Sequence, residues 1–156
     1  MTLGRFSVIP AVYVFLLRPG PTGGADEVLL QLRHGTGYMD DHWAAAVAGH
    51  VEKGESVYDA ALREAAEEAG IDELLLRPWC AMQRTGVGDD PVDERVDYFF
   101  LADTWRGTPR VREPAKAAGL RGAPLDDLPS PVVPHEGRVL ESVRLGSTPP
   151  IVVHGF

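Results

Sequence analysis

The sequence has little cysteine, few basic residues and no long apolar run. Its 156 residues include one cysteine, Cys80, which cannot form a disulfide within the chain and so predicts a reducing, cytoplasmic setting. The 15 Lys and Arg residues are outnumbered by 23 Asp and Glu residues, which gives a formal net charge of -8. Such a surface repels phosphate polymers and anionic lipids, so we expect neither long nucleic acids nor membranes as partners. A small anionic substrate is still allowed if a metal ion or a basic cluster neutralises it.

The longest apolar segment, residues 8–17, is interrupted by Pro10 and is too short to span a bilayer. No A-x-A cleavage site follows it, so we interpret it as a buried strand and not as a signal peptide. No internal repeat or linker divides the chain, and 44% of the residues are hydrophobic. We therefore expect one domain with one sizeable core over residues 1–156.

Strand-like and helix-like segments alternate along the chain, which predicts an α/β (α+β) fold. The first two strands are expected to pair as a hairpin because a short Pro/Gly-rich turn separates them. The predicted strands cover 9–17, 27–33, 43–48, 74–82, 95–105, 121–124 and 151–153, and the predicted helices cover 56–69 and 134–145.

The first helix has clear start and stop signals. Ser56 is a good N-cap, Asp59 occupies the capping-box position, and Gly70 is the expected left-handed residue after the last turn. An apolar face is expected from residues at helical spacing, namely Tyr58, Leu62, Ala65 and Ala69.

Three glutamates, Glu64, Glu67 and Glu68, stand at i, i+3 and i+4 and share one face, which we expect to be opposite the apolar one. Like charges at this spacing repel by roughly 0.2–0.5 kcal/mol per pair even in water. Several carboxylates together suit Mg²⁺ or Mn²⁺, which prefer hard oxygen ligands. The alternative is a solvated helix face, with Lys53 and Arg63 as incidental partners.

The spacing around these glutamates extends over residues 49–71. Gly49, Glu55, Arg63-Glu64, Glu67-Glu68 and Gly70 fill the fixed positions of G-x5-E-x7-R-E-U-x-E-E-x-G-U, with Ala65 and Ile71 at the aliphatic positions. This segment resembles the Nudix box, and the chain is therefore similar to the Nudix hydrolase superfamily.

The resemblance implies a fold and an activity. The expected fold is an α/β/α sandwich, in which helices flank a mixed sheet. Such enzymes hydrolyse a nucleoside diphosphate linked to another moiety, using Mg²⁺ or Mn²⁺ and a water molecule that attacks phosphorus.

The resemblance also assigns roles by position. Glu64, Glu67 and Glu68 correspond to metal ligands, and the carbonyl group of Gly49 or Ala48 corresponds to a further ligand. Many relatives have Pro-Gly or Gly-Gly where this chain has Val47-Ala48, and alanine adopts a positive φ less readily than glycine, so we expect a slightly shifted turn before Gly49.

Two further roles follow from the box. Arg63 and Glu55 correspond to an ion pair that orients the catalytic helix. Either Glu64 or Glu67 corresponds to the general base.

Outside the box, an acidic loop over residues 89–97 is the expected source of one more carboxylate ligand, with Glu94 and Asp97 as candidates. Guanidinium groups match phosphate oxygens, so three arginines are candidates for substrate binding, together with Asp97. A plain solvated surface is the alternative for each residue. The three arginines are Arg33, Arg84 and Arg95.

Substrate markers are largely absent. The fifteenth and sixteenth positions after the box are Gly86 and Val87, where Pro would mark ADP-ribose and Tyr a dinucleoside polyphosphate. The segment 112–134 resembles small MutT-like members, although Gly122 stands where many of those have Trp. We expect the substrate, and thus the partner of this chain, to be a small nucleotide, namely a nucleoside triphosphate. The alternatives are ADP-ribose, a nucleotide sugar, or a non-catalytic nucleotide-sensing module. Family members are often dimers, so a homodimer is also expected.

Overall fold

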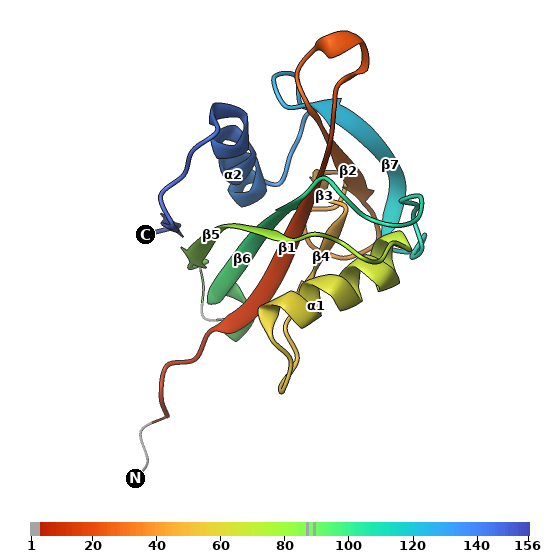
Figure 1. The fold of residues 1–156 in the computed structure, drawn as a ribbon. Helices are drawn as coiled ribbons and strands as arrows, with labels where there is room; N and C mark the ends of the chain where they lie inside the picture. The colour runs from red at the N-terminus through yellow and green to blue at the C-terminus, as the bar shows by residue number, and fades with distance from the viewer. Residues whose placement is uncertain (1–3, 87, 89) are drawn as a thin grey trace.

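A computed structural model describes residues 4–86, 88 and 90–156. Asp89 of the acidic loop and the marker position Val87 lie outside the described residues. In the part described, eight strands and two α-helices alternate as in Figure 1. The strands are β1 (Ile9–Arg18), β2 (Glu27–Arg33), β3 (Trp43–Ala45), β4 (Val47–His50), β5 (Arg77–Arg84), β6 (Arg95–Ala102), β7 (Ala117–Pro124) and β8 (Ile151–His154); the helices are α1 (Val57–Glu64), continued by a π-helical turn over Ala65–Ala69, and α2 (Pro134–Leu145).

The sheet is mixed, as expected. Its main order is β3-β2-β1-β6-β5-β8, with β4 paired to β1 and β7 paired to β2. The β1–β6 and β5–β8 pairs are parallel and the other pairs are antiparallel. The predicted hairpin of β1 and β2 is present.

Helices cover the two faces of the sheet, which confirms the α/β/α arrangement (Figure 1). The sheet has one hydrophobic core on each face, and alternate residues of β1 belong to different cores because successive strand side chains point to opposite faces. Val12, Val14 and Leu16 pack with Ala60, Ala61 and Ala65 on the α1 face. On the α2 face, Tyr13, Phe15 and Leu17 pack with Phe99, Val139 and Leu140.

Four predicted strands differ from the observed ones by several residues, and the one predicted at 95–105 ends earlier, at Ala102. The segment 43–48 is two strands, because β3 pairs with β2 whereas β4 pairs with β1, and the chain changes partner at Ala46. The segment 74–76 precedes β5 as a loop, in which Leu75 N–H donates to the Thr104 carbonyl (3.1 Å). The strand predicted at 121–124 begins earlier, at Ala117, because β7 pairs along the whole of β2.

The helix signals are confirmed, but the predicted apolar face is wrong in part. Ser56 and Asp59 form the capping box, and Gly70 has a left-handed φ of 67°. Tyr58 and Leu62 are 47% and 39% exposed, because the helix packs on the sheet through small alanines instead. The buried residues are Ala60, Ala61, Ala65 and Ala69.

Candidate active site

The carboxylate face of α1 is turned toward strand β4 and not away from the core, which corrects the expectation of a face opposite the buried side. β4 pairs with β1 along one edge, and on its other edge Ala48 N–H donates to Glu68 Oε2 (3.1 Å). This hydrogen bond anchors Glu68 against the strand. The helix and the strand therefore form one unit that fixes the position of a carboxylate.

Gly49 allows the second carboxylate to approach the strand. A Cβ atom at this position would overlap the Glu64 carboxylate, with Oε2 only 2.7 Å away. Neither Ala48 nor Gly49 has a positive φ, so the expected shifted turn is wrong, because both residues are extended within β4. Gly49 is required for space and not for backbone conformation.

We therefore expect Gly49→Ala to displace the Glu64 side chain while the chain stays folded. A displacement of about 1 Å at a reacting group can cost roughly a hundredfold in rate, so catalysis should fall toward that extent. Steady-state kinetics and a thermal melt measure the two effects. Gly119→Ala on β7 is the matched control, because nothing lies within 4 Å of its added Cβ. Unchanged kcat/KM in Gly49→Ala would show that Glu64 needs no fixed position.

Arg63 links the loop before the helix to the carboxylates. Its guanidinium donates to both oxygens of Glu55 (2.7 and 3.1 Å), so the ion pair implied by the sequence is present. It also donates to Glu64 (2.8 Å) and Glu67 (3.3 Å), and to the His50 carbonyl of β4 (3.0 Å). The hydrogen bonds and charges of Glu55 and Glu64 raise the pKa of Arg63 further, so this cation is permanent.

Burial makes the acidic cluster electrostatically costly. Burial first, and then the nearby charges of Glu64 and Glu113, raise the pKa of Glu68 to about 8. Burial likewise raises the pKa of Glu64, although Arg63 opposes this. A cation among these carboxylates would remove the cost.

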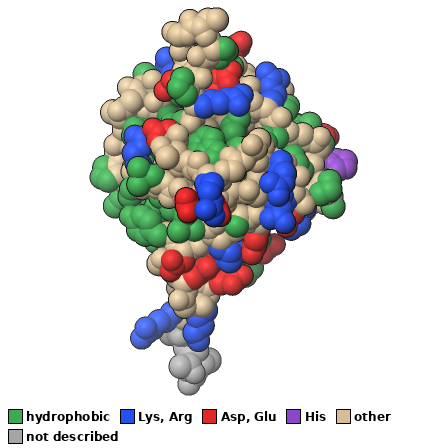
Figure 2. Space-filling view, turned by 45° about the vertical axis from the view of Figure 1, so that its right-hand side comes forward, with side chains coloured by type: hydrophobic (Ala, Val, Ile, Leu, Met, Phe, Trp, Pro, Cys, Tyr) green, Lys and Arg blue, Asp and Glu red, His purple; other side chains and the backbone are tan. Residues whose placement is uncertain are grey.

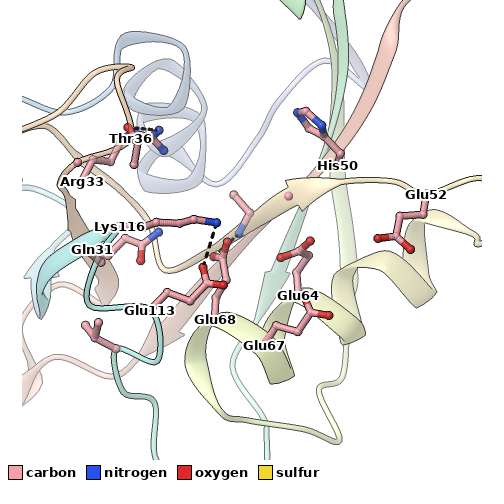
Figure 3. A pocket seen from close by; sticks show the side chains of 15 residues that line it. Gln31, Arg33, Thr36, His50, Glu52, Glu64, Glu67, Glu68, Glu113 and Lys116 are labelled. Carbon is pink, nitrogen blue, oxygen red and sulfur yellow. Dashed lines mark hydrogen bonds and ion pairs between the residues drawn. The ribbon is translucent and has the colours of Figure 1, made fainter.

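Glu113 is a carboxylate of this site that sequence reasoning missed. The residue before it is bound to the π-helical turn that continues α1, where Arg112 N–H donates to the Glu68 carbonyl (3.3 Å) and the Arg112 guanidinium donates to the Ala66 carbonyl (2.9 Å). Figure 3 shows the Glu113 carboxylate beside Glu68, with Lys116 Nζ 3.7 Å from Glu113 Oε2. No local motif marks Glu113, because only the tertiary path of the loop brings it here.

These groups line a pocket of about 580 Å³ (Figure 3). Glu64, Glu67 and Glu68 form one wall, while Arg33 and Lys116 supply cations across it. On the face of the molecule in Figure 2, acidic side chains likewise gather beside Lys and Arg side chains. The remaining polar lining residues, which sequence reasoning also missed, are Gln31, Thr36, His50 and Glu52.

A second pocket of about 440 Å³ adjoins the first on the α2 side of the sheet. Both pockets are lined by Arg33 and Thr36 and by residues 48–50 of β4. Arg33, Arg84 and Arg95, the three arginines predicted from the sequence, all line this second pocket. The two adjoining pockets together form one site, with carboxylates lining the first pocket and guanidinium groups lining the second.

Asp97 and Glu94 lie away from the carboxylate pocket. Asp97 is fully buried, and its Oδ2 accepts from Arg84 Nε (2.8 Å) while its Oδ1 is 3.5 Å from Arg95 Nε. Glu94 accepts from the Thr85 hydroxyl (2.6 Å). The structure thus places Asp97 as the anchor of two arginines, and it brings Glu113 and not Asp97 or Glu94 to the carboxylate pocket.

The first turn of α2 contributes two buried polar residues to the second pocket. Glu136 is 2% exposed, and its Oε1 accepts from Ala45 N–H (2.7 Å). Burial raises its pKa to about 7. His135 is 3% exposed and lies 3.3 Å from the Tyr13 hydroxyl, and burial lowers its pKa to about 2.

The raised pKa of Glu136 makes a prediction about stability. Between its unfolded pKa near 4.5 and its folded pKa of about 7, the folded state binds more protons than the unfolded state, so Glu136 loses stabilising effect as pH rises through this window. We expect Glu136→Gln to become progressively more stable relative to the native chain from about pH 4.5 to 7, with a constant difference above that. Denaturant unfolding in EDTA at several pH values measures it. His135 contributes to the pH dependence of both proteins with the opposite sign, so its contribution cancels when their free energies of unfolding are subtracted. A difference in free energy of unfolding that does not change with pH would contradict the prediction.

The donor set fits a hard divalent cation. Glu64, Glu67, Glu68 and Glu113 offer carboxylate oxygens and Gly49 a backbone carbonyl, which are ligands that Mg²⁺ and Mn²⁺ prefer. Within residues 4–86, 88 and 90–156, no three His, Cys, Asp or Glu side chains already converge on one ion position. That is compatible with Mg²⁺, which usually takes one or two protein carboxylates and completes its shell with water and phosphate oxygens.

Comparison with known proteins identifies the family. The sequence profile of the NUDIX domain matches residues 8–143. The chain belongs to the Nudix hydrolase family. It is 32% identical over 108 residues to the uncharacterized Nudix hydrolase YvcI of Bacillus subtilis (strain 168), covering 67% of this chain and 66% of that relative, which is just under two thirds of its length.

Solved Nudix structures have the same fold. The MutT NUDIX hydrolase of Burkholderia pseudomallei superposes with a TM-score of 0.75 at 27% identity, covering 88% of this chain and 98% of that one. The NUDIX domain of Shewanella oneidensis NrtR, solved with ADP ribose, superposes with a TM-score of 0.70 at 16% identity and covers 90% and 88%. At this identity the second likeness concerns the fold alone. Among the described residues, no helix is long and apolar enough to cross a membrane.

Proposed function

We propose that the chain is a metal-dependent pyrophosphohydrolase that cleaves a nucleoside diphosphate linked to another moiety, with a nucleoside triphosphate, modified or not, as substrate. The observation that carries this proposal is the convergence of Glu64, Glu67, Glu68 and Glu113 on a pocket that adjoins an arginine-lined one. A magnesium or manganese ion would supply charge neutralisation at the phosphates and activation of water.

The burial and contacts of the residues suggest which of them would bind the metal and which would accept a proton. Glu67, Glu68 and Glu113, with the Gly49 carbonyl, would hold the metal. Glu64 would accept the proton of the attacking water, because Arg63 holds its carboxylate in position at the pocket wall beside the groups that would bind the metal.

The positively charged groups orient the substrate and the helix. Arg63 holds Glu64 and Glu67 in place through its two-oxygen contact with Glu55. Arg33 lines both pockets and would bind phosphate oxygens between them.

Release of phosphate or pyrophosphate from a nucleotide panel tests the proposal. The panel holds common and oxidised nucleoside triphosphates, ADP-ribose, nucleotide sugars and dinucleoside polyphosphates, each with Mg²⁺, Mn²⁺ or EDTA. Turnover of triphosphates that EDTA abolishes supports the proposal, whereas preferred turnover of ADP-ribose or a nucleotide sugar would replace the substrate class. Binding of nucleotide without turnover in either metal would favour the sensing module.

A further inference from the structure

The loop between β2 and β3, residues 34–42, lies at the junction of the two pockets. Thr36 of this loop and Arg33, the last residue of β2, line both pockets. The loop is closed at its base, because Arg33 N–H donates to the His42 carbonyl (2.9 Å) and Asp41 N–H donates to the Arg33 carbonyl (2.8 Å). It therefore begins and ends beside Arg33.

The Asp40 carboxylate holds the turn of this loop. Its Oδ1 accepts from the Thr36 hydroxyl (2.7 Å) and from Thr36 N–H (3.0 Å), and its Oδ2 accepts from Gly37 N–H (3.0 Å). The hydrogen bonds from Thr36 lower the pKa of Asp40, so this carboxylate is ionised near neutral pH. Hydrogen bonds to an ionised acceptor are stronger than those to a neutral one, so these three donors fix the shape of the turn.

The same turn orients the Arg33 guanidinium. Its Nε donates to the Tyr38 carbonyl (2.9 Å) and its Nη2 donates to the Thr36 hydroxyl (3.0 Å; Figure 3). That hydroxyl has one proton, and its shortest contact is with Asp40 Oδ1, which leaves its lone pairs for Arg33. The two hydrogen bonds fix the plane of the guanidinium, while Nη1 is left to bind a ligand.

We propose that Asp40 is a positioning residue, which acts through Thr36 to hold the Arg33 guanidinium in the geometry that binds phosphate oxygens. The inference deepens the proposed function, on which it rests for the phosphate role of Arg33. Asp40 itself lines neither of the two pockets, so it acts on the substrate through the turn. A guanidinium that is already held loses less conformational freedom on binding and binds phosphate more tightly than a mobile one.

The sign of the effect separates positioning from charge. A carboxylate near a phosphate site repels the anion, so loss of the Asp40 charge alone should tighten phosphate binding. Loss of the held guanidinium should weaken it. Asp41→Asn is the matched control, because it removes the same charge one residue along the loop and keeps the N–H that binds the Arg33 carbonyl. Asparagine also tolerates the positive φ of 63° at this position.

Calorimetric titration of inorganic pyrophosphate with Mg²⁺ tests the inference without any turnover. We expect Asp40→Ala and Thr36→Val to weaken binding roughly threefold to tenfold, which is part of the value of a charge-assisted hydrogen bond. Asp41→Asn should bind pyrophosphate at least as tightly as the native chain, and Thr36→Ser, which keeps the hydroxyl, should restore most of what Thr36→Val loses. Asp40→Ala should cause no further loss when Arg33 is already alanine.

The Arg33 Nε–H signal in ¹⁵N NMR spectra reports on the position of the guanidinium directly. Arg33→Ala identifies this signal by removing it. In the native chain we expect the Nε–H group to be as ordered as the backbone on the ps–ns timescale, and in Asp40→Ala we expect it to become mobile. An ordered Nε–H group in Asp40→Ala would overturn the inference.

Three binding results would also overturn it. Unchanged or tighter pyrophosphate binding in Asp40→Ala would show that the carboxylate acts only as a charge. An equal loss when Asp40→Ala is added to Arg33→Ala would show that its effect does not pass through the guanidinium. Failure of the native chain to bind pyrophosphate would remove the phosphate role of Arg33. A lack of hydrolysis in the nucleotide panel is a separate failure, because none of these measurements depends on turnover.

Discussion

Glu68→Gln is expected to lower kcat/KM for metal-dependent nucleotide hydrolysis by at least roughly a hundredfold while the chain stays folded. Replacing groups that only orient metal ligands costs roughly 10- to 100-fold, so a direct ligand should reach at least the upper value. The amide still has an oxygen for Ala48 N–H, so the contact between helix and strand survives. The variant loses the negative charge of the Glu68 carboxylate, and with it the attraction to the metal ion.

The stability of the same variant separates this role from a structural one. Burial raises the pKa of Glu68 in the folded state to about 8. Near neutral pH the Glu68 carboxyl therefore ionises more readily in the unfolded chain, which lowers the stability of the metal-free folded protein. Glu68→Gln should therefore unfold at the same or a higher denaturant concentration in EDTA, and added Mg²⁺ should stabilise it less than it stabilises the native chain. Glu141→Gln on α2 is the control, for which both activity and the response to Mg²⁺ should be native. Native activity in Glu68→Gln would remove the residue from the proposed metal site.

Local signals were sufficient for the catalytic helix. Ser56, Asp59 and Gly70 act within one turn of the backbone, so their capping roles follow from sequence spacing alone. The Arg63–Glu55 pair also follows from the box, because the intervening loop is short and the box spacing is specific. The positions of both helices follow from such local rules.

The orientation of that helix depends on tertiary packing. The predicted apolar face was wrong in part: Ala65 and Ala69 are buried as expected, but Tyr58 and Leu62 are exposed, because the helix packs close to the sheet through small alanines. Glu64 and Glu68 are consequently partly buried against β4, which raises the pKa of each, whereas Glu67 stays exposed. A helical wheel gives the angle between residues but not which side meets the sheet.

Residues of the site that come from distant segments escape sequence reasoning for the same reason. Glu113 reaches the carboxylate pocket through hydrogen bonds of Arg112 to the end of the helix, and Glu136 reaches the second pocket from the first turn of α2. Asp97 was predicted as a further carboxylate ligand, but the register of β5 and β6 places Arg84 and Arg95 beside it instead. Charge pattern identified Asp97 and the two arginines as candidates, and strand pairing determined that they contact one another.

Arg63→Ala should reduce both activity and stability, because one side chain bridges the loop, the helix and β4. Its removal leaves Glu55, Glu64 and Glu67 without their common cation and frees the His50 carbonyl. Arg63 is 25% exposed, so water compensates in part, and we expect a loss of roughly 1–3 kcal/mol in the free energy of unfolding. We expect kcat to fall roughly tenfold to a hundredfold, because Glu64 is no longer held for proton transfer.

A matched surface arginine distinguishes this role from the general loss of an ion pair. Arg106 also contacts two carboxylates, Asp72 (2.7 Å) and Glu73 (3.1 Å), but it is 66% exposed and lines neither pocket. Arg106→Ala should therefore keep native kinetics. Added Mg²⁺ should raise the melting temperature of Arg63→Ala more than that of the native chain, because the ion takes over neutralisation of the unpaired carboxylates. If both arginine variants kept native kinetics and an equal response to Mg²⁺, Arg63 would have no function beyond packing.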